Sequence, residues 1–317
     1  MRFDIRYLTS FAYPEAVRSS HNVLRACPIT DARQELLSYR VATTPASRVF
    51  NYIDYWGTRV DVFGIAVPHT RLEVLVEATV QTRDTGPLTA CPRLASLRDT
   101  DFAAEHQEYL EPSPHTAWGE ALRRESEIRA ANAGDDVVGA VLALHRASAT
   151  SITYTPGSTY VGMDVNEVFT RKTGVCQDYA HLMVAMCRSV GIPARYVSGY
   201  LAAARGGRTK TSADNAEVTT HAWIEVAIPG AGWWGLDPTN QQEIGSAHVK
   251  IAHGRDYDDV APLRGVYHGP TAHRLDVSVK IAPQDGAPQQ HQNGRHVPAA
   301  RKPAERVAVM QRQQQSQ

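Results

Sequence analysis

The sequence predicts an α+β fold, in which an antiparallel β domain precedes a core made of a cysteine-bearing helix and an antiparallel sheet. Three observations support this fold class. Apolar and polar residues alternate along much of the first 83 residues, as in half-buried strands. Helical patterns follow between about residues 135 and 190, and alternation returns over residues 221–239. Strands followed by helices are typical of α+β proteins.

The pattern divides the 317-residue chain into four parts. Residues 1–83 are predicted to form the β domain, with a hairpin at residues 54–60, because alternation occurs at both of its ends. Residues 84–118 contain several prolines and are predicted to be a linker with an early helical segment. Residues 119–282 would form the core and include its terminal strands. Residues 283–317 are rich in Gln, Pro, Ala and Arg, and this composition predicts a disordered tail.

The central helix of the core is predicted to begin beside Cys176. Gly174 interrupts the preceding helical pattern, apolar residues recur at roughly helical spacing on one face over residues 175–190, and Gly191 ends the helix. A thiol in the first turn lies at the positive end of the helix dipole, which favours the thiolate and can stabilise a developing oxyanion. Cys187, later in the same helix, is interpreted as an apolar filler.

An imidazole and a carboxylate follow on a predicted hairpin. His221 begins an alternating stretch that ends at Ile228, and a Gly-containing turn leads to a partner strand over residues 233–239. If Ile228 pairs with Gly232, then His221 and Asp237 share a face as diagonal neighbours, about 7–8 Å apart at Cα. A four-residue loop without a bulge would place them on opposite faces. In the favourable register, a base and the group that orients it lie within reach of each other.

These residues carry a family resemblance, which covers roughly residues 100–265. Gly174–Asp178 (GVCQD), His221–Val226 (HAWIEV) and Asp237–Asn240 (DPTN) resemble the three sequence blocks of the transglutaminase-like superfamily of papain-type thiol enzymes. Segments 254–260 and 264–267 also resemble its bacterial subgroup with an added N-terminal β domain. The run Val218–Thr220 departs from the more familiar acidic-small-small pattern and is expected to alter a loop.

The resemblance implies a papain-like core with Cys176 as nucleophile, His221 as base and Asp237 as its orienter. An acyl-enzyme thioester formed on such a cysteine can pass to water or to an amine. Hydrolysis, by a cysteine peptidase or amidase, is narrowly favoured because the sequence reveals no channel that selects amines over water. Protein-glutamine acyl transfer is the alternative, and a non-catalytic peptide-binding module is a third possibility that the intact triad opposes. The expected partner is a peptide or protein amide.

Two further residues are candidates for supporting roles. Asp178 is expected in the first helical turn, where a carboxylate suits the dipole and supports the geometry of the site. Trp223 is expected either to line the cleft or to fill the core. The four-residue spacing of His221 and Glu225 would suit a metal only on a helix, so neither a metal nor another cofactor is expected on this alternating segment.

Composition excludes several classes of function. Lys and Arg together number 33, as do Asp and Glu, so the chain lacks the global charge that favours nucleic acid or an anionic membrane. The four cysteines are too widely separated for a disulfide framework. Neither a signal peptide nor a membrane span is evident, which predicts a cytoplasmic protein. Residues 202–215 are expected to be an ordinary solvated loop, with gating of the cleft as the alternative.

Overall fold

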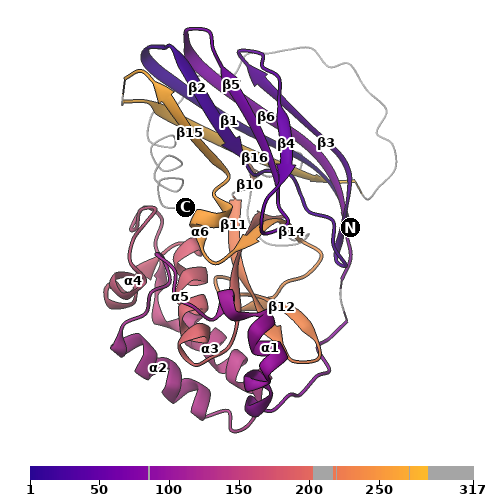
Figure 1. Ribbon diagram of the computed structural model, residues 1–317, viewed down its shortest axis with the longest axis vertical. Coiled ribbons are helices and arrows are strands. Elements are labelled where there is room, and N and C mark those ends of the chain that lie inside the picture. Colours follow the sequence, from indigo (N-terminus) through magenta and orange to yellow (C-terminus); the bar gives the residue numbers. More distant parts are fainter. Residues whose placement is uncertain (85, 203–216, 219, 271, 285–317) are drawn as a thin grey trace.

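The computed structural model describes residues 1–317 except 85, 203–216, 219, 271 and 285–317. A β-rich region lies beside a region of helices and strands (Figure 1), which confirms the predicted α+β class. The predicted tail beyond residue 284, most of the 202–215 loop and the side chains of the Val218–Thr219 pair fall outside the described residues.

The β domain consists of two antiparallel sheets. One has the order β10-β16-β1-β6-β3 and the other β15-β2-β5-β4. The predicted hairpin corresponds to β4 and β5, and Gly57 in its turn has φ of 77°, a conformation that favours glycine. The strands are β1 (Arg2–Val17), β2 (Ser19–Leu24), β3 (Gln34–Thr44), β4 (Phe50–Ile53), β5 (Arg59–Ile65), β6 (His69–Thr82), β10 (Glu217–Val218), β15 (Leu263–His268) and β16 (Arg274–Pro283).

The terminal strands require a correction to the predicted core of residues 119–282. β16 pairs with β1 from Phe3↔Pro283 to Ala12↔Arg274, and β15 pairs with β2. Both strands therefore belong to the β domain (Figure 1). Their alternating pattern shows that they are strands but not which distant strand they join, so the sequence could not assign them to a sheet.

The core combines helices with a sheet of order β13-β12-β11-β9-β14. Its strands are β9 (Ala194–Leu201), β11 (Thr220–Ile228), β12 (Gly232–Asp237), β13 (Gln242–Glu243) and β14 (His248–Gly254), and the short β7 (Thr153–Tyr154) and β8 (Thr173–Gly174) pair in parallel nearby. The helices are α1 (Thr100–Glu105), α2 (Glu120–Ala131), α3 (Val137–Ser151), α4 (Val165–Arg171), α5 (Cys176–Ser189) and α6 (Tyr257–Val260), with 3₁₀ turns at Leu94–Arg98 and Gln107–Tyr109.

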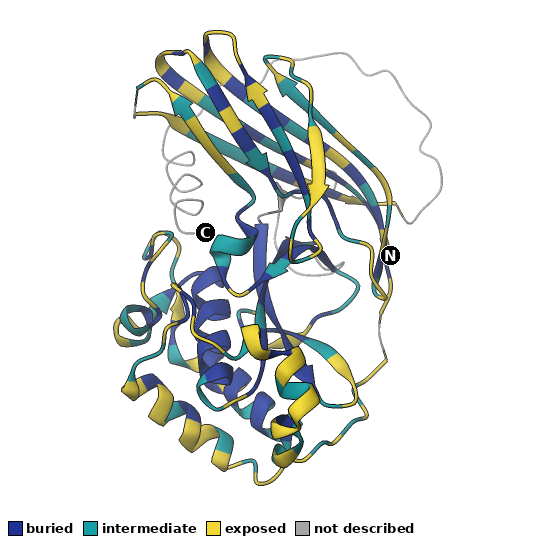
Figure 2. Cartoon of the chain, in the orientation of Figure 1, coloured by how far each residue is buried: buried dark blue, intermediate teal, exposed yellow. Residues whose placement is uncertain are grey.

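Helix α5 begins at Cys176 as predicted, but it is buried on all sides rather than on one face. Every residue from Cys176 to Arg188 is buried, because α2, α3, α4 and the sheet surround the helix (Figure 2). Its polar residues find partners inside: the guanidinium of Arg188 donates hydrogen bonds to the carbonyl oxygens of Ala194, Glu111 and Arg255. This enclosure fixes the first turn of α5 relative to the sheet.

None of the helices in the described part of the chain combines the length and apolar character needed to cross a membrane.

Candidate active site

The start of α5 is held in place by the side chain of Asp178. Its Oδ2 accepts hydrogen bonds from the backbone N–H of Val175, at 2.7 Å, and from the hydroxyl of Thr159, at 2.6 Å. Burial outweighs these two bonds and raises the pKa of Asp178 to about 6. A Cβ at Gly174 would lie 2.7 Å from the Cβ of Asp178, so the tight entry to the helix requires glycine. Asp178 thus shapes the loop that presents Cys176.

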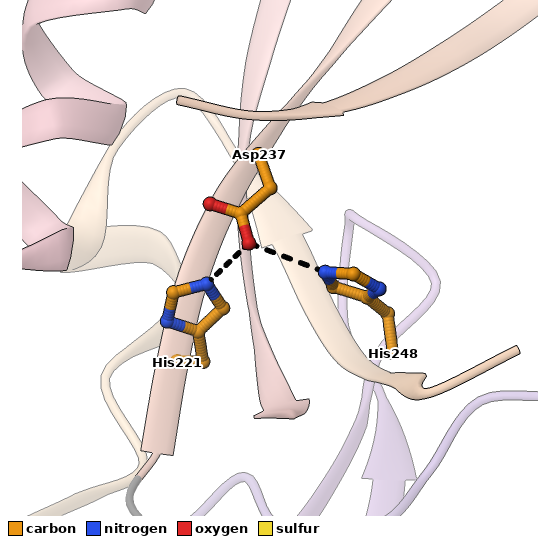
Figure 3. A group of neighbouring side chains, drawn as sticks. All are labelled: His221, Asp237 and His248. Carbon is orange, nitrogen blue, oxygen red and sulfur yellow. Dashed lines mark hydrogen bonds and ion pairs between the residues drawn. The ribbon is translucent and has the colours of Figure 1, made fainter. Parts of the chain in front are cut away.

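The hairpin brings His221 and Asp237 together. Pairing runs from Ile228↔Gly232 to Ile224↔Leu236, which confirms the predicted register. Nε2 of His221 lies 2.8 Å from Oδ2 of Asp237 (Figure 3). His221 also forms a side-chain hydrogen bond with Cys176. Since Nε2 is engaged with the carboxylate, Nδ1 is the ring nitrogen left to exchange a proton with the thiol.

Electrostatics favour a charged pair at the hairpin. Burial alone would lower the pKa of His221, but hydrogen bonds with Asp237 and Cys176 outweigh it and raise that pKa to about 10. Burial would likewise raise the pKa of Asp237, yet hydrogen bonds from His221, His248 and Asn240 hold it well below its usual range. The site therefore stabilises an imidazolium beside a carboxylate at neutral pH.

Sequence reasoning missed two partners of this carboxylate. His248, at the start of β14, places Nε2 3.2 Å from Oδ2 of Asp237 (Figure 3), and Nδ2 of Asn240 lies 2.7 Å from the same oxygen. The backbone N–H groups of Thr239 and Asn240 donate to Oδ1. The DPTN segment signals such a turn, because Asp side chains often accept bonds from the backbone two or three residues later. No local signal marks His248, which approaches through the pairing of β14 with β9.

Trp223 packs against the rings of His221 and His248 and does not face solvent. It is fully buried, and its ring meets that of His248 edge-on, with centroids 5.3 Å apart. A Cβ at Gly199 would come within 2.4 Å of the Trp223 ring and 2.2 Å of the carbonyl oxygen of Val249. Of the two expected positions, Trp223 therefore takes the one in the core, and the absence of a side chain at Gly199 leaves room for its indole ring.

Among the residues that the structure describes, two groups of side chains have spacings that could suit a metal ion. His221, Asp237 and His248 offer ligand atoms within 4.8 Å of one another, as do His115, Asp256 and Asp258. The hydrogen bonds described above already organise the first group, so we interpret it as a hydrogen-bond network.

In the second group, Asp256 caps α6 and Asp258 pairs with Arg264.

Glu225, four residues after His221, is bound in a buried ion cluster with Lys250 and Arg195.

Comparison with known proteins identifies the family. Residues 126–238 match the family model of the transglutaminase-like superfamily, and residues 3–81 match the bacterial transglutaminase-like N-terminal region. An uncharacterized protein of Mycobacterium leprae is 36% identical over 287 residues, covering 88% of this chain and 98% of that protein. The chain belongs to the transglutaminase-like superfamily and carries the N-terminal region found in bacterial members, as the sequence predicted.

Two further similarities concern one segment of the chain and the overall fold. A segment covering 36% of this chain is 35% identical, over 121 residues, to 17% of a protein-glutamine gamma-glutamyltransferase of Pseudomonas aeruginosa. The crystal structure of a protein of Cytophaga hutchinsonii, named as a candidate cysteine protease, superposes with a TM-score of 0.70 at 23% identity over 93% of this chain and 94% of that one. The second similarity shows a shared fold. Together with the family, the site supports a cysteine enzyme.

Proposed function

We propose that this protein is a cysteine hydrolase that cleaves amide bonds of peptides or proteins through a thioester on Cys176. His221 would act as general base and acid, and Asp237 would orient it. One observation carries the proposal: His221 is hydrogen-bonded both to the thiol of Cys176 and to the carboxylate of Asp237, and all three residues are buried in one site. This arrangement is the one that nucleophilic thiol catalysis requires.

The first half of the reaction forms the acyl-enzyme. In the charged pair, the proton of the Cys176 thiol already lies on Nδ1 of His221, and Sγ of Cys176 attacks the amide carbonyl carbon. The positive end of the α5 dipole stabilises the oxyanion of the tetrahedral intermediate. The C–N bond then breaks, and the imidazolium of His221 gives its proton to the leaving amine.

The second half releases the product. Water attacks the thioester carbonyl while His221 takes a proton from that water. Collapse of the second tetrahedral intermediate then expels the thiolate of Cys176 and leaves a carboxylic acid. Throughout, the carboxylate of Asp237 holds the ring of His221 and stabilises its charged form, as its hydrogen bond at 2.8 Å allows.

Transfer to an amine is the second candidate. The local similarity to a protein-glutamine gamma-glutamyltransferase favours it. In that reaction the carboxamide of a glutamine loses ammonia to form the thioester, and a primary amine then takes the place of water. The same three residues serve both outcomes, because the fate of the thioester depends on which nucleophile reaches it.

The two outcomes can be separated with β-casein as substrate, with and without a fluorescent primary amine. Hydrolysis predicts ammonia or new amino termini without amine incorporation, whereas label on casein glutamines would favour transfer. Cys176→Ala should abolish either product. Cys187→Ala is the matched control, because Cys187 is fully buried in the same helix and its loss should cost only packing. Product formation by Cys176→Ala would contradict both versions of the proposal.

A non-catalytic module is tested by the chemistry of the thiol itself. Peptide mass after exposure to an electrophilic peptide analogue should show an adduct on Cys176, and the exposed Cys91 serves as the reference for non-specific thiol modification. A chain that binds the analogue without an adduct on Cys176 would indicate a binding module.

A further inference from the structure

The carboxylate of Asp237 is saturated with hydrogen-bond donors. Its Oδ2 receives bonds from His221, His248 and Asn240, while two backbone N–H groups bond to Oδ1. Asp237 itself is fully buried. A buried carboxylate remains ionised only where donors replace the water that it has lost. Each donor is therefore part of what keeps Asp237 charged.

The geometry also fixes which nitrogen of His248 carries the proton. The backbone N–H of Gly245 donates to Nδ1 of His248 at 3.1 Å, so Nδ1 must be unprotonated. A neutral imidazole with a bare Nδ1 carries its hydrogen on Nε2, which lies 3.2 Å from Oδ2 of Asp237. His248 is thus set to donate to the carboxylate as a neutral ring. Its side chain is only 2% exposed, and its ring packs edge-on against Trp223.

We propose that His248 is a positioning residue of the triad: as the neutral Nε2–H tautomer, it holds the carboxylate of Asp237 ionised and aimed at His221. This role rests on the proposed thiol chemistry. Two imidazoles from different strands, His221 on β11 and His248 on β14, converge on one oxygen of Asp237 (Figure 3). The first exchanges protons with the thiol, and the second keeps the carboxylate in place.

Loss of this donor should weaken the site most at acidic pH. Without the His248 donor, the carboxylate of Asp237 is held less firmly against His221, and the imidazolium of His221 then loses part of the stabilisation that its counter-charge provides. In the described part of the chain, the titratable groups bonded to Asp237 are His221 on β11, His248 on β14 and His145 on α3, whose Nε2 lies 3.0 Å from the Asp237 carbonyl oxygen. Of these, His248 also accepts a hydrogen bond from the backbone N–H of Gly245 on its second ring nitrogen.

A matched pair of variants isolates the donor. His248→Asn places an acceptor near the position of Nδ1 and can keep the Gly245 bond, but it has no group at Nε2. His248→Gln places an amide N–H near Nε2 and can restore the bond to Asp237. The probe is iodoacetamide, with alkylation of Cys176 followed by peptide mass between about pH 4 and 9. The exposed Cys91 serves as an internal reference for intrinsic thiol reactivity.

The expected result is a split between the two variants. His248→Asn should shift the acid limb of Cys176 alkylation upward by about one pH unit and reduce the rate near pH 5 about tenfold, whereas His248→Gln should follow the wild type. Equal acid limbs in all three proteins would overturn the proposal, as would equal shifts in both variants, which would indicate a packing role. A wild-type thiol that shows no reactivity at low pH would instead count against the proposed function.

The wild-type protein provides a check that does not depend on how the variants fold. Long-range ¹H–¹⁵N spectra distinguish the two ring nitrogens of a histidine. At pH 7, His248 should show a protonated Nε2 and an acceptor-type Nδ1. A ring protonated at Nδ1 would exclude donation from Gly245 and refute the assignment.

Discussion

Replacing Asp237 with Asn should separate the charge of the triad from its shape. In one orientation, the new amide nitrogen would face His221, His248 and Asn240, all of which now donate to Oδ2. In the other, it would face the backbone N–H groups that now donate to Oδ1. In either orientation the amide N–H₂ group faces at least two other hydrogen-bond donors, so their bonds to this position are lost. Hydrogen bonds to charged groups are worth about 1.5–3 kcal/mol each.

The expected kinetic loss is about 10⁴-fold in kcat, by comparison with the same change in serine triads. This factor corresponds to about 5 kcal/mol of transition-state stabilisation. The assay is steady-state amide cleavage with folding checked by circular dichroism. Asp61→Asn is the matched control, because Asp61 is also fully buried but bonds to Tyr39 and Arg59 in the β domain. A folded Asp237→Asn variant within about tenfold of the wild type would show that another group orients His221.

Two other substitutions test neighbouring parts of the site. Alkylation of wild-type Cys176 should persist well below pH 8.5, the reference pKa of a free thiol, and His221→Ala should remove that low-pH reactivity. An alkylation profile of the wild type with a single midpoint near pH 8.5 would argue against a preformed thiolate–imidazolium pair. Gly199→Ala should destabilise the fold by several kcal/mol in urea unfolding, because the new methyl would overlap the Trp223 ring and the carbonyl oxygen of Val249. An unchanged midpoint would show that Gly199 does not lie against these two groups.

The parts of the site that the sequence predicted depend on local chemistry. The start of α5 follows from Gly174, and the meeting of His221 with Asp237 follows from a short turn that fixes the register of two neighbouring strands. The parts that it missed depend on distant pairing. His248 reaches Asp237 through β14, whose register with β9 shifts between Lys250 and Ala252.

The β domain also contributes to this long-range arrangement. The side-chain amide of Gln34 accepts a hydrogen bond from the backbone N–H of Lys250 and donates one to its carbonyl oxygen, both at 2.8 Å. The side chain thus pairs with β14 at its irregularity as a strand would, and it holds the element that carries His248. Residues 34 and 250 are far apart in the sequence, and their contact does not affect the local alternation of apolar and polar residues. Sequence patterns therefore could not predict it.

Glu225, on hairpin strand β11, is the centre of a buried ion cluster. Oε2 of Glu225 lies 2.5 Å from Nζ of Lys250 and 2.6 Å from a guanidinium nitrogen of Arg195, and the three side chains are at most 12% exposed. Burial would raise the pKa of Glu225, but the two cations outweigh it and lower that pKa to about 2. One carboxylate therefore compensates two buried positive charges.

The two partners should respond unequally to removal. Glu225→Gln leaves Lys250 and Arg195 as unpaired neighbouring cations and should cost about 3–5 kcal/mol in urea unfolding at pH 7, whereas Lys250→Met leaves Glu225 paired with Arg195 and should cost much less. The folded pKa of Glu225 is depressed, so its stabilising effect is complete above the ordinary value of about 4.5 and is lost as pH falls towards 2. The deficit of Glu225→Gln should accordingly shrink over that window, because the wild-type carboxylate then becomes neutral as well. If Lys250→Met proved the more damaging change, Glu225 would not be the member on which the cluster depends.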